Sequence, residues 1–89
     1  MEIVFNQVGR TWQAEFTVTA DFNLHIERPA MGFMHLSQRT GDSGEYDTAH
    51  IFENGQFVYD YDFTALVYPK SIKIVSEVKP TLARLTIAE

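Results

Sequence analysis

The sequence contains no cysteine, only three prolines and five glycines, and no long hydrophobic run. The lack of cysteine excludes disulfide scaffolds, thiol nucleophiles and zinc sites built on thiolates. No stretch approaches the roughly 18 apolar residues that a membrane span needs. The first residues, Met1 to Phe5, contain neither a basic segment nor an apolar core, so no signal peptide is visible. We therefore expect an intracellular or particle-associated protein.

Positive charge is also scarce. Twelve acidic residues stand against seven basic ones, which gives a net charge of −5, and the basic residues are scattered along the chain. Nucleic acids and anionic membranes are bound by clustered Lys and Arg. We expect neither a nucleic acid nor a membrane as a partner.

Catalytic motifs are missing as well. There is no Gly-x-Ser-x-Gly elbow, no phosphate-binding loop and no His-Glu-x-x-His pair, and no serine has an evident histidine partner. We therefore expect a protein that is not an enzyme and has no cofactor. The 89 residues predict a single domain over 1–89, whose margin of stability is narrow at this size. A protein partner or self-association would stabilise such a chain.

What the sequence does contain is a strict alternation of apolar and polar residues. Short alternating runs rich in Val, Ile, Phe and Tyr are separated by turn residues, a pattern typical of half-buried strands. Eight such runs predict an all-β fold, a small antiparallel β-sandwich of immunoglobulin-like type. A small barrel or a jelly roll is the alternative.

The segment from Tyr46 to Phe63 carries the strongest local signal, an Asn54-Gly55 pair typical of a two-residue type I′ turn. We expect a β-hairpin with one aromatic face, formed by these cross-strand pairs: Phe52 with Phe57, His50 with Tyr59, Thr48 with Tyr61 and Tyr46 with Phe63. The other runs are expected to pair with their neighbours in the chain, through these contacts: Val18 with Phe22, Phe16 with Leu24, Leu24 with Leu36 and Ile74 with Leu85.

The same registers would align Glu15, His25 and His35 across three strands. Side chains of directly paired residues lie about 4.5 to 5.5 Å apart. Two imidazoles and a carboxylate at this spacing are a candidate site for Zn²⁺ or another divalent metal. The alternative is a polar outer face without a metal.

An acidic cluster is the second candidate site. The hairpin would place Asp47 opposite Asp62, with Asp60 on the same face. Like charges in direct opposition destabilise a sheet, so compensation is expected. It could come from Ca²⁺, from Lys70, Lys73 or Arg84 of another strand or subunit, or from water alone.

The aromatic face is predicted to form mostly core. Part of it could emerge at the surface, and we expect a contact surface formed by Tyr46, Tyr61, Tyr68, Asp42 and Ser43, the last two in the 40–44 loop. The sequence thus favours a non-catalytic structural or interaction module within a homo-oligomer or a larger assembly, such as a phage or virion particle. The alternative is a carbohydrate- or peptide-binding module that uses exposed Tyr residues and Trp12.

Overall fold

The computed structural model describes residues 1–41 and 44–87, and within them the chain forms eight strands and no helix. The strands are β1 (Asn6–Val8), β2 (Thr11–Val18), β3 (Phe22–Glu27), β4 (Met34–Thr40), β5 (Asp47–Phe52), β6 (Val58–Phe63), β7 (Lys70–Ser76) and β8 (Leu82–Ile87). The all-β prediction is confirmed. None of the described residues forms a helix long and apolar enough to cross a membrane.

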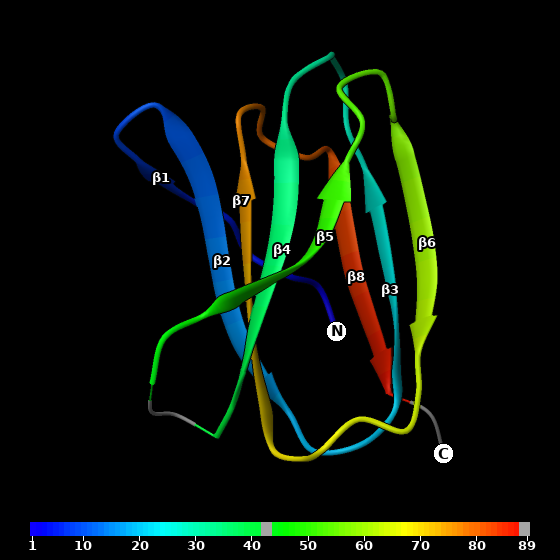
Figure 1. Ribbon diagram of the computed structural model, residues 1–89. Helices are drawn as coiled ribbons and strands as arrows, with labels where there is room; N and C mark the ends of the chain where they lie inside the picture. Colours follow the sequence, from blue (N-terminus) through cyan, green and yellow to red (C-terminus); the bar gives the residue numbers. More distant parts are fainter. Residues whose placement is uncertain (42–43, 88–89) are drawn as a thin grey trace.

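The strands form two separate antiparallel sheets packed face to face (Figure 1). One sheet has five strands in the order β1-β2-β7-β4-β5, and the other has three in the order β6-β3-β8. The sandwich prediction is therefore confirmed, and the closed barrel is excluded.

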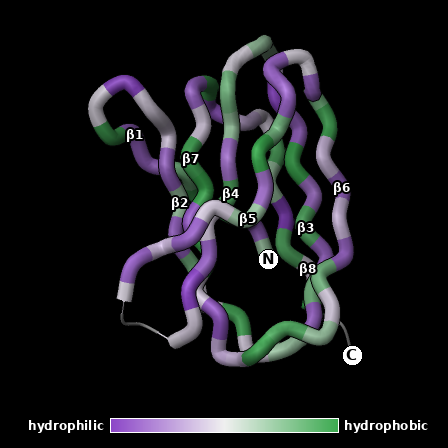
Figure 2. Tube along the Cα trace, viewed as in Figure 1, coloured by the Kyte–Doolittle hydropathy of each residue, from purple (hydrophilic) through white to green (hydrophobic). Residues whose placement is uncertain are grey.

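The alternation assigns each side chain to the face that the sequence predicts. On β3, Phe22, Leu24 and Ile26 are buried, whereas Asn23, His25 and Glu27, which alternate with them, are only partly covered. The colours along this strand alternate accordingly (Figure 2). Leu36, Ile72 and Ile74 bring the opposite sheet into the same core and are fully buried. A strand buries one face of alternate residues, so period two is the pattern that this packing requires.

The predicted neighbours of these strands are wrong, although their faces are right. Observed partners come from distant parts of the chain: Ala14 with Ile74, Leu24 with Leu85 and Leu36 with Ile74. The connections from β2 to β3, from β3 to β4 and from β7 to β8 all cross from one sheet to the other. An apolar face can be buried by a strand in the facing sheet as well as beside one in its own, and alternation is identical in the two cases.

The predicted hairpin is also wrong, because β5 and β6 belong to different sheets. A turn does form at Asn54-Gly55, where the Gln56 N–H donates to the Glu53 carbonyl at 3.0 Å. Gly55 is not among the residues with a positive φ, which a type I′ turn requires at both central positions. The turn therefore joins two sheets instead of two paired strands.

Arg28 explains why the chain crosses here. Its side chain is only 4% exposed and lies between the β3–β4 and β5–β6 connections. Its guanidinium donates to the carbonyl oxygens of Gly32, Glu53 and Gln56, and its own backbone N–H donates to Phe57 at 2.8 Å. Burial lowers the pKa of Arg28, but an arginine keeps its charge in proteins. One buried cation thus holds the β3–β4 and β5–β6 connections together.

Replacing Arg28 by Met should destabilise the fold by about 3 kcal/mol, because several buried carbonyls lose a charged donor at once. The matched control is Arg84→Met on the exposed face of β8, which should change stability by less than about 0.5 kcal/mol. Urea unfolding measures both. Equal effects of the two substitutions would contradict the role given to Arg28.

The β6–β7 connection is held by Asp21. Its Oδ1 accepts hydrogen bonds from the Ala65 backbone N–H at 3.1 Å and from the Tyr68 hydroxyl. Ala65 has a φ of 57°, the left-handed region that strains a residue with a Cβ atom. The Asp21 carboxylate therefore helps to keep this connection in a strained conformation.

Substituting Ala65 by Gly should stabilise the chain by about 0.5 kcal/mol, since relief of the left-handed strain exceeds the added entropy of the unfolded chain. Ala30→Gly, at an exposed position of the β3–β4 connection, serves as the control and should destabilise by a similar amount. Thermal unfolding of the two variants shows whether each substitution raises or lowers the stability. A loss of stability in the Ala65→Gly variant would contradict the backbone strain assigned to Ala65.

Candidate interaction edge

Among the residues that the structure describes, two of the four sheet edges are protected. β1 has only three residues. β8 is covered by the N-terminal segment, where the Ile3 N–H donates to the Ala83 carbonyl at 2.9 Å and the Leu85 N–H donates to the Met1 carbonyl at 2.8 Å. Short or covered edge strands prevent unwanted pairing with other chains.

β5 and β6 are the two edges that are neither short nor covered by another segment. Within the described residues, β5 pairs only with β4, and β6 pairs only with β3. Side chains of the two strands meet across the sandwich, with ring centroids 4.0 Å apart for Phe52 and Tyr59 and 4.9 Å apart for His50 and Tyr61. Both edges therefore lie on the same side of the molecule, which we call the β5/β6 edge (residues 47–52 and 58–63).

The predicted aromatic face is partly confirmed, but it forms between the sheets. Phe52, Tyr59 and Phe63 are buried, as expected of core. Phe57 is 45% exposed and does not join them. Tyr46 does not join them either: its ring lies under the Arg39 guanidinium at 4.5 Å, and its hydroxyl donates to Glu15 at 3.5 Å.

His50 is oriented by Tyr59, whose hydroxyl lies 3.1 Å from His50 Nδ1. Burial, together with the neighbouring Tyr61, raises the pKa of Tyr59 well above its usual value, so the phenol keeps its proton. Tyr59 and His50 are therefore joined by one hydrogen bond between β6 and β5.

A cleft of about 260 Å³ opens between the two strands. It is lined by Gln38, His50, Tyr61, Asp62, Phe63 and Leu66, among others. The register of β5 on β4 shifts between Leu36 and Ser37, a β-bulge next to this cleft. Bulges bend a strand and often occur at sheet edges beside binding sites.

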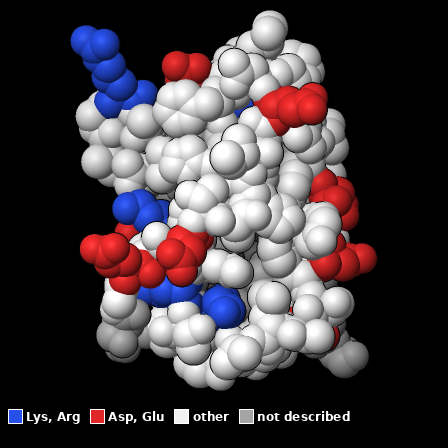
Figure 3. All heavy atoms as spheres, viewed as in Figure 1, with Lys and Arg blue, Asp and Glu red and all other residues white. Residues whose placement is uncertain are grey.

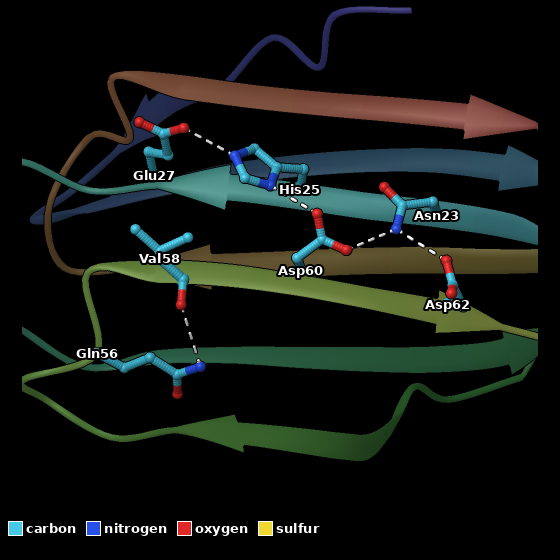
Figure 4. A network of polar contacts seen from close by, with 7 residues as sticks. All are labelled: Asn23, His25, Glu27, Gln56, Val58, Asp60 and Asp62. Atoms are coloured by element: carbon cyan, nitrogen blue, oxygen red, sulfur yellow. Dashed lines mark hydrogen bonds and ion pairs between the residues drawn. The ribbon is translucent and has the colours of Figure 1, made fainter.

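The outer face of β3 and β6 carries a continuous polar network (Figure 4). Asn23 Nδ2 donates to Asp60 Oδ1 at 2.8 Å and to Asp62 Oδ1 at 2.9 Å. The His25 ring lies 2.9 Å from Asp60 through Nδ1 and 2.8 Å from Glu27 through Nε2. The network therefore joins two of the three residues of the predicted acidic cluster, and Asn23 and His25 form hydrogen bonds with their carboxylates.

Asp47, the third residue of that cluster, lies on β5 in the other sheet, so its predicted pairing with Asp62 is wrong. Of the basic residues considered as partners, Lys73 lies 4.0 Å from Glu15 instead. Asn23 was missed from the sequence because only the pairing of β3 with β6 brings its amide between two carboxylates.

The predicted row of Glu15, His25 and His35 does not form. Glu15 and His35 lie on β2 and β4 of the five-stranded sheet, whereas His25 lies on β3 of the other sheet. The register that aligned them is wrong because the chain crosses to the other sheet between β2 and β3 and again between β3 and β4. Within the described part of the chain, no group of three or more His, Cys, Asp or Glu side chains could hold a metal ion.

The predicted contact residues are dispersed. Tyr61 is 47% exposed at the β5/β6 edge, while Tyr68 is tied to Asp21 and packs against the core. Asp42 and Ser43 lie outside the described residues. Trp12 is half-buried against the core, with Lys79 Nζ 5.1 Å from its ring centre, so it is not part of the β5/β6 edge.

No protein-family model matches the chain, and neither a curated protein nor a solved structure matches it.

The network predicts a pH dependence of stability. The hydrogen bonds of Glu27, and then of Asp60, raise the pKa of His25 above 6.5, and those of Asn23 and His25 lower the pKa of Asp60 below 3.8. Protonated His25 therefore stabilises the fold fully below pH 6.5 and loses this effect as the pH rises through its folded-state pKa. The contribution of ionised Asp60 is present above pH 3.8 and is lost as the pH falls through its own lowered value.

An NMR titration of the His25 ring tests this directly. We expect a midpoint above 6.5 in the native chain, and a return toward 6.5 in the Glu27→Gln/Asp60→Asn variant because both acceptors lose their charge. A native midpoint at or below 6.5, or one that the double substitution leaves in place, would contradict the network.

Proposed function

We propose that this chain is a non-catalytic interaction module that joins a larger assembly through the β5/β6 edge. The observation that supports this most is the uneven protection of its edges: the two on one side are open, and the two others are short or covered. Open strands are templates for pairing with another chain. The assembly would be a homo-oligomer or a larger particle, such as that of a phage or virion.

The side chains of the open edge support the same proposal. Ile51 is 80% exposed, Val58 is 57% exposed and Tyr61 is 47% exposed. Aliphatic and aromatic side chains around unpaired strands are what a second chain would cover, and tyrosine is enriched where binding energy concentrates. A partner at this edge would also add to the narrow stability of a chain of 89 residues.

We further infer that the sandwich is of the immunoglobulin-like type. Its size, its strand count and its two-sheet packing support this inference.

The native complex tests the proposal. The chain, tagged and recovered from its source cells, should elute at a mass well above its own 10.2 kDa in size-exclusion chromatography with light scattering. The Ile51→Lys/Val58→Lys variant should elute as the free chain, because two charges at the edge block pairing. Val4→Lys is the matched control, since Val4 is also exposed (71%) but lies on the N-terminal segment.

Two results would refute the proposal. One is a native chain that elutes at 10.2 kDa from its source cells. The other is a double variant that keeps the mass of the native complex. Loss of the complex in the Val4→Lys control as well would place the contact elsewhere.

A further inference from the structure

We propose that the β6 edge takes a basic, extended strand from another protein as its partner. Its Lys or Arg side chains face Asp60 and Asp62, and one of its apolar side chains enters the cleft between β5 and β6. This inference rests on the proposed function and names the chemistry of the partner.

The spacing of the carboxylates fits the period of a strand. Asp60 and Asp62 project from the same outer face of β6, two residues apart, which is about 6.8 Å along the strand. A strand added to this edge places alternate side chains on the same face at the same interval. Two basic residues separated by one residue would therefore face the two carboxylates directly, and unlike charges at such positions stabilise a pair of strands.

The carboxylates are held in position before a partner arrives. Asn23 bridges them, and His25 fixes the second oxygen of Asp60. A carboxylate accepts more hydrogen bonds than these, so both groups retain acceptor capacity for a Lys or Arg. Groups fixed in advance lose less entropy on binding.

The surface charge agrees with a basic partner. Red atoms recur along the right-hand side of Figure 3, over β6, and no blue atoms gather there. On the inner side of the same strand, Tyr61 is half-exposed and borders the cleft with His50 and Leu66. Residues of an added strand that alternate with the basic ones would face this side. The partner is thus a strand in which basic and apolar residues alternate.

A second copy of this chain does not supply such a strand. Of its basic residues, Arg39, Lys73 and Arg84 lie on strands that already have neighbours on both sides. Arg28 and Lys70 are buried, and Arg10 and Lys79 lie in connections between strands. The edges that remain open, β5 and β6, carry Asp47, Asp60 and Asp62, which would repel one another across a symmetric contact.

A synthetic peptide in which Lys and Val alternate is the probe, labelled for fluorescence anisotropy at low salt. We expect it to bind roughly tenfold more tightly than a peptide of the same composition with its lysines in one block, because only the alternating peptide fits the edge. The Asp60→Asn/Asp62→Asn variant should bind it roughly five- to twentyfold more weakly. The matched control is Glu45→Gln/Glu77→Gln, which removes the same charge at two exposed positions outside the β5/β6 edge and should change binding less than about twofold.

Thermal unfolding of each variant accompanies the binding experiment, and Asp62→Asn alone serves if the double substitution unfolds the chain. Equal binding of the two peptides, or equal losses in the two double variants, would overturn the proposal in favour of unspecific charge attraction. A native complex that consists of this chain alone would overturn it too, while leaving the proposed function intact. A native chain that binds neither peptide and also elutes at its own mass would overturn both proposals.

Discussion

The structure depends on one buried cation. Arg28 lies at one end of the sandwich, where its guanidinium donates hydrogen bonds to carbonyl oxygens of the β3–β4 and β5–β6 connections. A buried cation without such acceptors would be very costly, so both connections must stay where Arg28 can reach them. With the β5–β6 connection held by Arg28, β5 belongs to one sheet and β6 to the other. The open edges, the aromatic contact between them and the cleft all follow from that separation.

Alternation predicted the class of fold and the face of most side chains, because period two is a local property of the chain. Phe22, Leu24 and Ile26 are buried as expected. Alternation did not predict neighbours, since a buried face is satisfied either within a sheet or across the sandwich. Asn54-Gly55 predicted a turn correctly and a hairpin wrongly. The cause lies about 26 residues away, in an arginine whose burial no local pattern of the sequence indicates.

The candidate site was predictable only in pieces. Asp60 and Asp62 were expected on one polar face, and they lie together there. Their hydrogen bonds with Asn23 required the pairing of β3 with β6, which is contrary to the order of the chain. The open edge itself depends on strand order throughout both sheets. It is therefore a property of the whole topology, and no motif in the sequence carries it.

Hydrogen exchange of the backbone amides of β6, followed by NMR on the free chain and on its native complex, tests this account most directly. An antiparallel edge strand points every second N–H group toward its neighbour and the others outward. We expect alternate amides from Val58 to Phe63 to exchange rapidly in the free chain and to become protected in the complex. Uniform protection of β6 in the free chain, or rapid exchange of the same amides in the complex, would contradict it.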